Sequence, residues 1–199
     1  MYAVVLSFFA FLFTFFASSG VGGVVQYRYD VIRSGKLVGH MVCNKYEKDG
    51  VVLFTNEVDV HISILMDIDI HNKVEGMYAD GFLLKGSMER IVNGKPKKNN
   101  QIIWKTDKYL IDGNGTHTEL NAKIAFTTVC LMYMEPEKIE RVYSEGFRQY
   151  VSLKKIALHK YALQLPDGDY NYYTYKDGRC IELEVPTTFS TIFIRPSSK

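Results

Sequence analysis

The sequence predicts an all-β protein: a strongly curled antiparallel meander, shaped like a half-barrel, with one short apolar helix. A long run alternates apolar and polar residues with a period of two, which is typical of strands with one buried and one solvated face. Pairs of turn-forming residues recur at fairly regular intervals. The sequence also lacks a strand–helix–strand rhythm and a glycine-rich phosphate loop, so a parallel sheet is not expected.

The alternating run covers residues 52–74, where most even-numbered residues are Val, Ile, Phe or Met and most odd-numbered residues from Glu57 onward are charged or polar. At about 3.3 Å per residue the run would span roughly 75 Å if straight. A domain of this size is only about 40 Å across, so the run must bend or break. Leu65 puts an apolar residue on the polar face, which places the break at residues 63–66. A strongly curled sheet follows.

Asp-Gly, Asn-Gly and Ser-Gly pairs supply the positive φ angles of tight hairpin turns. The expected turns are Ser34-Gly35, Asp49-Gly50, Asp80-Gly81, Asn93-Gly94, Asp112-Gly113, Asp167-Gly168 and Asp177-Gly178. Residues 95–98, a basic cluster after Asn93-Gly94, are interpreted as a solvated hairpin loop. Asn114-Gly115-Thr116 matches the glycosylation pattern but is interpreted first as part of a turn.

Residues 127–134 break the strand pattern with a nearly continuous apolar run. Thr127 is a candidate cap, and Glu135-Pro136 would end the run, so one or two turns of buried helix are expected. Such a helix would plug the concave side of the sheet. Residues 137–143 leave a helical alternative open, whereas residues 143–153 alternate well enough for a strand.

The amino-terminal segment predicts export. Residues 3–17 are almost entirely apolar, and small residues follow, so residues 1–19 are interpreted as a signal peptide cleaved between Ser19 and Gly20. Residues 20–199 would form a single β-meander domain in the periplasm or outside the cell. Because Lys and Arg are missing before the apolar core, an uncleaved membrane anchor is the alternative. No cysteine follows the run closely, so a lipoprotein is not expected.

Charge and cysteine content exclude other classes of protein. With 24 basic and 22 acidic residues the net charge is +2, so a nucleic-acid partner is not expected. Cys43, Cys130 and Cys180 are scattered and allow at most one disulfide. Neither Cys-x-x-Cys nor a His-rich spacing occurs, so we expect no structural zinc site and no cofactor.

Several short motifs resemble those of a known group of proteins. They are Tyr29-x-Val31-x3-Gly35-x3-Gly39, Tyr133-x-Glu135-Pro136, Tyr143-Ser144-Glu145, Pro166-Asp167-Gly168 and Tyr173-x-Tyr175-x-Asp177-Gly178. In order and spacing they are similar to exported meander proteins grouped as domains of unknown function with a YmcC-like fold. The resemblance covers nearly all of residues 20–199, and its motifs are mostly turn and core residues. It implies a curled antiparallel sheet in the envelope of a Gram-negative bacterium, and it assigns no catalytic residue.

Polar clusters offer little chemistry in the sequence. His61, Asp67, Asp69 and His71 share the polar face of the long run, but residues two apart on a strand lie nearly 7 Å apart. A metal ion would therefore need partners from a neighbouring strand, and a solvated face is the favoured interpretation. Glu135 and Glu145, close to the expected helix, could form an acid–base pair. Surface or turn hydrogen bonding is favoured for both.

Aromatic and thioether side chains give the remaining candidates. Tyr170, Tyr172, Tyr173 and Tyr175 straddle both faces of one strand, which favours cross-strand packing over a ligand-facing shelf. Methionines pack against varied shapes, although core filling is the favoured role for Met132 and Met134. The speculative ligand-binding set is Met132, Met134, Tyr172 and Tyr173.

Three functions follow from these observations. The favoured hypothesis is a non-catalytic binding module whose partner is an acyl chain or another hydrophobic molecule. The alternative is a structural component of the cell envelope that docks another protein through a sheet edge. A hydrolase-type enzyme is third and would need a cleft with convergent polar groups; we predict no catalytic residue and no metal ligand.

Overall fold

The computed structural model describes residues 22–63 and 67–198. The predicted signal peptide, with its cleavage site at Ser19 and Gly20, lies outside these residues. Within them the elements are β1 (Gly23–Arg33), β2 (Lys36–Lys48), β3 (Val51–Ser63), β4 (Asp67–Ala79), β5 (Phe82–Val92), β6 (Lys95–Lys105), β7 (Lys108–Gly113), β8 (Thr116–Leu120), the 3-10 helix η1 (Thr128–Met132), β9 (Arg141–Ser144), β10 (Gln149–Ala157), β11 (Lys160–Gln164), β12 (Tyr170–Lys176), β13 (Arg179–Thr187) and β14 (Ser190–Pro196).

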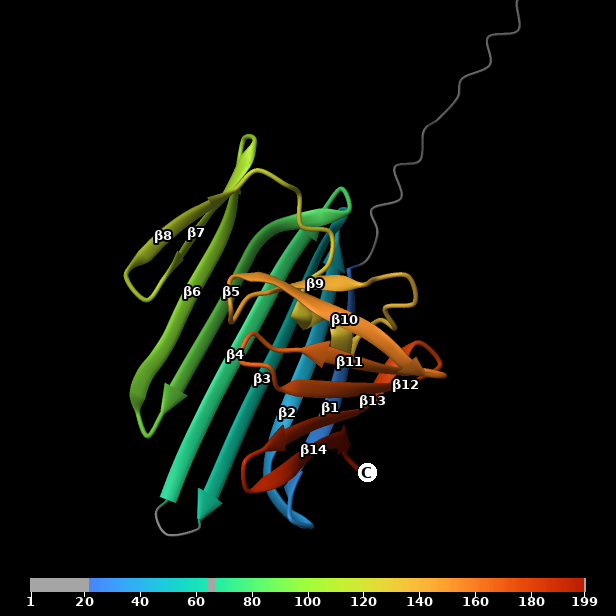
Figure 1. The fold of residues 1–199 in the computed structure, drawn as a ribbon. Coiled ribbons are helices and arrows are strands. Elements are labelled where there is room, and N and C mark those ends of the chain that lie inside the picture. The colour runs from blue at the N-terminus through green and yellow to red at the C-terminus, as the bar shows by residue number, and fades with distance from the viewer. Residues whose placement is uncertain (1–21, 64–66, 199) are drawn as a thin grey trace, which may run out of the picture.

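The strands form one antiparallel sheet in the order β8-β7-β6-β5-β4-β3-β2-β1-β14-β13-β12-β11-β10-β9. Consecutive strands are neighbours in the sheet except β8 and β9, which lie at opposite edges. The two halves of the meander join at a seam where β1 pairs with β14 through residues such as Tyr29 and Pro196. Figure 1 shows the long strands β1–β6 side by side in one wall, with the shorter strands β9–β14 crossing it obliquely. The sheet curls without closing, with β8 and β9 at its edges. The predicted curled, all-β meander is confirmed.

The long alternating run breaks where the sequence predicts. β3 ends at Ser63, β4 begins at Asp67, and the two strands pair residue for residue from Ser63–Asp67 to Val52–Tyr78. The even-numbered residues of β3 face the interior, where Phe54 is buried and Val58 packs against the core. The odd-numbered face of this hairpin is therefore polar from Thr55 to Ser63 and from Asp67 to Glu75, and it becomes apolar at the Leu53–Met77 pair.

Most expected turns are present, with positive φ at pairs such as Ser34-Gly35 and Asp177-Gly178. The prediction for Asp112-Gly113 is wrong, because both residues lie in β7 and the turn falls on Asn114 and Gly115. Asn-Gly accepts two successive positive φ angles, so the glycosylation pattern is indeed part of a turn. Turns with positive φ at Thr106, Arg148 and His159 were not predicted, since in none of them does glycine follow the positive-φ residue.

Two segments differ from their predictions. Residues 95–98 begin β6 instead of forming a loop, with Lys95 paired to Val92 and Lys98 to Arg90. The helical alternative for residues 137–143 is wrong, because β9 starts at Arg141. Residues 143–153 are divided between β9 and β10 by a tight turn at Arg148. A short turn lets the chain reverse at the sheet edge where a single strand was expected.

The predicted apolar helix is present as η1, and it joins two buried clusters. Leu131 and Met132 pack with Tyr29, Val142 and other residues of one cluster. Val129 and Cys130 pack with the second cluster, which contains Leu83, Ile102 and Tyr109 among others. The concave side of the sheet is thus filled by side chains, as the plug hypothesis predicts.

The cysteines are buried and free. Burial, the largest cause in each case, raises the pKa of Cys130 to about 11 and that of Cys180 to about 12, and it also raises the pKa of Cys43. Nucleophilic chemistry needs the thiolate, so these cysteines serve as core residues.

Candidate functional site

The segment that crosses the concave side, here called the strap (residues 121–140), is fixed by hydroxyl groups from the sheet. Tyr175 Oη donates to Leu131 O at 2.8 Å, and Tyr133 Oη donates from the strap to Thr55 O at 2.6 Å. Thr127 precedes η1 in extended conformation, but its side chain does not cap the helix and instead accepts a hydrogen bond from Tyr78 Oη at 2.8 Å. The strap is therefore held by hydrogen bonds from the hydroxyls of Tyr78, Tyr133 and Tyr175, and not by a Thr127 cap.

A cleft of about 630 Å³ lies where the strap leaves η1 and meets the β10–β11 and β12–β13 turns. This volume is in the range of small-molecule sites. We call it the rim cleft. It is lined by Tyr27, Tyr133, Met134, Glu135, Glu137, His159, Tyr175, Lys176, Asp177, Gly178 and Arg179.

One wall of the rim cleft is aromatic. The rings of Tyr27 and Tyr133 lie 6.0 Å apart, and the guanidinium of Arg179 sits over the Tyr27 ring at 4.5 Å. A cation over an aromatic face is attracted by the ring quadrupole. Met134 adds an apolar surface, with 39% of the residue exposed. An apolar group entering the cleft would meet rings and a thioether, with a cation at their edge.

Polar groups converge at the other wall around Glu135. Its backbone N–H donates to Gly178 O at 2.9 Å, and its carboxylate accepts from Tyr161 Oη at 2.9 Å. His159 Nδ1 lies 2.9 Å from the second carboxylate oxygen. Burial alone would raise the pKa of Glu135, but the hydrogen bonds from His159 and Tyr161 outweigh it and lower that pKa. The carboxylate is thereby kept ionised and fully engaged.

Glu135 and Glu145 belong to separate networks. Glu145 is completely buried and accepts hydrogen bonds from Thr128 Oγ1 at 2.5 Å and from the Val129 N–H at 3.3 Å. Glu145 is a hydrogen-bonded residue of the β9–β10 turn, as one form of the favoured interpretation predicts, but it does not lie on the surface because the strap covers it. Its role in this network is to hold the start of η1.

The predicted ligand-binding residues are only partly brought together. Met134 lines the rim cleft, whereas Met132 and Tyr173 are core residues that are 2% and 6% exposed. Tyr172 is half-buried elsewhere on β12, and its ring is stacked on that of Tyr170 at 6.3 Å. Side chains from one strand point to opposite faces, so Tyr172 and Tyr173 cannot share one site.

Three residues of the rim cleft are not among the predicted site residues: Tyr27, His159 and Arg179, which come from distant strands or turns. A signal was nevertheless present. The motif Tyr133-x-Glu135-Pro136 and the motif ending in Tyr175-x-Asp177-Gly178 meet at this cleft. Hydrogen bonding of Glu135 to Gly178 shows that the two motifs pair.

Comparison with known proteins places the chain in a family. A family model described as a domain of unknown function (DUF6134) matches residues 29–197. The chain belongs to this family. The matched residues include both motifs at the rim cleft, the part of β1 from Tyr29 onward, and every strand from β2 to β14. The DUF6134 domain is therefore nearly the whole described sheet.

A solved structure supports the fold of this DUF6134 chain. The chain is similar to a beta-barrel-like protein of domain of unknown function DUF1849 from Brucella abortus, with a TM-score of 0.52 and 10% sequence identity. The similarity covers 87% of this chain and 95% of that one. No curated protein matches. Among the described residues there is no helix of the length and hydropathy needed to cross a membrane.

Proposed function

We propose that this DUF6134 protein is a non-catalytic binding module that takes the acyl or other hydrophobic part of a small ligand in the rim cleft. The observation that carries the proposal is the wall formed by Tyr27, Tyr133 and Met134, which leaves apolar surface open at the edge of a filled core. Arg179 and Lys176, which line the cleft together with Glu135, Glu137 and Asp177, can pair with the anionic part of a polar head group.

The packing of η1 limits where a hydrophobic ligand can bind. Leu131 and Met132 fill the concave side, which counts against a ligand held beneath the helix. A binding site at the rim requires no opening of the sheet. Glu135 has its lone pairs engaged by His159 and Tyr161, which favours a structural role for this carboxylate over acid–base catalysis.

A larger hollow of about 750 Å³ lies between the strap and β9–β10, with Lys123, Lys138 and Arg141 among its residues. The Arg141 guanidinium already sits over the Tyr150 ring at 4.8 Å. We favour the rim cleft because its apolar wall is contiguous and its polar groups converge on one side.

The first test is native mass spectrometry of protein purified gently from its natural compartment. A recurrent adduct of lipid or small-molecule mass supports the proposal, and it also identifies the class of ligand. The second test is titration of the purified protein with a fluorescent long-chain fatty acid. Met134→Glu should weaken binding by roughly tenfold or more, since burying one large apolar side chain stabilises by about 1.5–3 kcal/mol.

Matched controls separate the cleft from general surface effects. Leu37→Glu changes another exposed apolar residue, distant in sequence and outside the rim cleft. Arg179→Ala is compared with Arg195→Ala, because Arg195 also sits over an aromatic ring, that of Phe193, at 4.5 Å. Equal losses in both members of either pair would count against the rim cleft, and loss only in Arg141→Ala would move the site to the larger hollow.

We also propose export to the periplasm or the cell exterior, in the envelope of a Gram-negative bacterium, as a member of the YmcC-like group. The support is the apolar segment of residues 3–17 followed by small residues. The mass of the purified protein tests this directly. A chain beginning at Gly20 supports a cleaved signal, and retention of residues 1–19 in a membrane fraction supports the anchored alternative.

A second candidate function is protein docking by strand addition at β8. Four of its five residues are exposed, and it is an edge strand with β7 as its neighbour in the sheet. Exposed edges can pair with a strand of another protein. Replacing Thr118 by Pro should abolish capture of such a partner without changing fatty-acid binding, whereas a loss of both would indicate general misfolding.

A further inference from the structure

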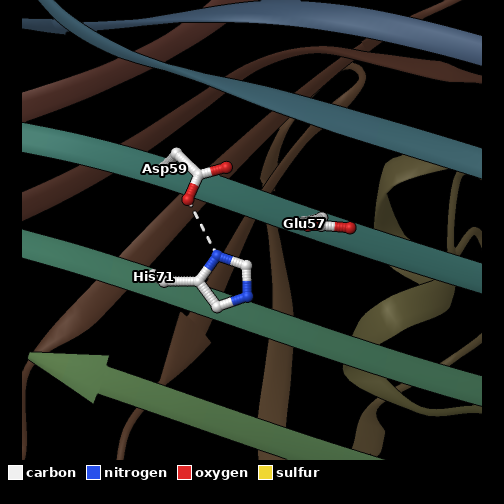
Figure 2. Close-up of side chains that lie close together, drawn as sticks. All are labelled: Glu57, Asp59 and His71. Atoms are coloured by element: carbon white, nitrogen blue, oxygen red, sulfur yellow. Dashed lines mark hydrogen bonds and ion pairs between the residues drawn. The ribbon is translucent and has the colours of Figure 1, made fainter. Parts of the chain in front are cut away.

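We propose that Glu57, Asp59 and His71 form a binding site for a divalent transition-metal ion of the Zn²⁺ type on the outer face of the β3–β4 hairpin. The favoured interpretation of this face from the sequence was a solvated one, with cross-strand partners required for any metal. The structure supplies those partners. Figure 2 shows Glu57 and Asp59 on β3, with His71 on the neighbouring strand and joined to Asp59.

The register of the hairpin brings the three side chains together. Asp59 lies directly opposite His71, and Glu57 is two residues along β3 on the same face. Since directly opposed side chains lie about 5 Å apart at Cβ, the pair can approach one ion in a way that neighbours along one strand cannot. One oxygen of each carboxylate and one ring nitrogen lie within 4.8 Å of one another.

The imidazole is already oriented toward the carboxylate of Asp59. Its Nδ1 lies 2.8 Å from Asp59 Oδ1, and the His71 side chain is 29% exposed while that of Asp59 is 72% exposed. A hollow of about 320 Å³ borders Asp59 and His71, together with His61 and Asp69. The ring is therefore held by its surroundings, the carboxylates are free to adjust, and solvent reaches the site.

The three donor atoms suit an ion of intermediate softness such as Zn²⁺. One imidazole nitrogen and two carboxylate oxygens are usual Zn²⁺ ligands, and three protein ligands leave a position for water. Bonds of about 2.0–2.2 Å to one ion place neighbouring donor atoms roughly 3–4 Å apart. Small rotations of the side chains would bring the three donor atoms from their present separation to this distance. The same donors would bind Mg²⁺ weakly, because imidazole is a poor ligand for that ion.

Charge around the hairpin favours a cation. Asp67 and Asp69 lie on the same face as Glu57 and Asp59. Lys73 stands opposite Glu57 in the register, but its ammonium pairs with Glu75 at 3.0 Å. The Lys73 ammonium also feels the charge of Glu57, but its hydrogen-bonded ion pair is with Glu75, so the Glu57 carboxylate keeps its oxygens available to an ion.

Other His–Asp pairs in the protein provide built-in controls. His40 lies 3.2 Å from Asp30 on β1–β2 and is also exposed. Among the described residues, Glu57, Asp59 and His71 are the group of three whose donor atoms approach one another in this way. A metal site requires the third donor, so His40 should not contribute.

The test is isothermal titration of the chelator-treated full chain with ZnCl₂. We expect one saturable site, and a weaker one for MnCl₂, as the order of divalent ions predicts. His71→Gln, Asp59→Asn and Glu57→Gln should each weaken Zn²⁺ binding by at least about tenfold, a loss that even outer partners of metal ligands cause. His40→Gln should leave it unchanged.

Each outcome decides the proposal. Loss in the three variants with an intact His40→Gln supports the site, provided that circular dichroism shows the same fold. Equal effects of His71→Gln and His40→Gln would overturn it as general surface adsorption. Loss in His61→Gln with no effect of His71→Gln would also overturn it, by moving the ion to the His61–Asp69 pair at 2.7 Å. Fatty-acid binding should be unaffected, since these residues lie outside the rim cleft.

Discussion

Two glutamates of the strap region titrate in opposite directions because their surroundings differ. Glu145 is enclosed by the protein, and burial raises its pKa despite hydrogen bonds from threonine hydroxyls. Glu135 is engaged by His159 and Tyr161, and its pKa is lowered. Burial without a cation favours the neutral acid, whereas donated hydrogen bonds and a nearby imidazole favour the carboxylate.

The buried carboxyl should make stability fall as pH rises above the ordinary carboxyl range. The folded state holds the Glu145 proton to higher pH than the unfolded state, so stability declines from the unfolded pKa up to the folded pKa. Glu145→Gln should flatten this decline, which is at most about 1.4 kcal/mol per pH unit for one proton. Urea unfolding between pH 5 and pH 8 measures it, with exposed Glu140→Gln as the control.

Glu135 should act in the other direction. Because its pKa is lowered in the folded state, ionised Glu135 stabilises the fold at pH values above the pKa that it has in the unfolded chain. This stabilisation is lost as the pH falls through the pKa of the folded state. Glu135→Gln should reduce the acid sensitivity of unfolding below pH 5. An unchanged acid limb in this variant would show that the contacts with His159 and Tyr161 do not contribute to stability.

At the scale of elements, one glycine allows β2 and β3 to lie close together at a point where a side chain would not fit. Gly39 on β2 lies opposite Val60, and a Cβ there would meet Asp59 O at 2.0 Å and Val60 Cα at 2.8 Å. Those atoms are backbone and cannot rotate away. The β2–β3 pairing therefore requires glycine at this position, although its φ is not positive.

Gly39→Ala should destabilise the fold by about 1–3 kcal/mol, the range for overpacking. Gly23→Ala is the matched control, because Gly23 is also a strand glycine and has nothing within 4 Å of the added carbon. Thermal unfolding of both variants provides the comparison. A melting temperature equal to that of the control would mean that β2 and β3 can shift freely.

Anchoring of η1 gives a second prediction at this scale. Tyr175→Phe removes the hydroxyl that donates to Leu131 O and leaves a buried carbonyl without this donor. A loss of about 1–3 kcal/mol is expected. Amide hydrogen exchange should rise at Val129–Met132 in this variant, more than in Tyr170→Phe, which changes a more exposed ring on the same strand.

At the scale of the whole molecule, the first and last strands hold the sheet together. β1 pairs with β14, so residues near position 30 contact residues near position 195. Contacts between such distant parts of a chain form slowly, and folding should take milliseconds to seconds. Deleting residues 190–199 should abolish cooperative unfolding, whereas deleting residues 198–199 should not, because the latter lie beyond β14.

The fold was predictable from local pattern, and the candidate site was not. The two-residue period of β3 and β4 and the Asp-Gly and Asn-Gly turns depend on neighbours in sequence, so they can be recognised without a structure. In the turns at Arg148 and His159 no glycine follows the positive-φ residue, so neither contains an Asp-Gly or Asn-Gly pair. The rim cleft joins Tyr27 of β1 to Arg179 of β13, a proximity that only the β1–β14 seam creates.

The tyrosines that fix the strap also give the protein an alkaline limit. Burial is the first cause that raises the pKa of Tyr78, Tyr133 and Tyr175, and their phenols stay neutral while the fold persists. Unfolding releases them to ionise at their usual pKa near 10, so base pulls the equilibrium toward the unfolded chain. The part of the phenolate absorbance that comes from these three tyrosines should therefore appear abruptly, at the pH where the strap detaches.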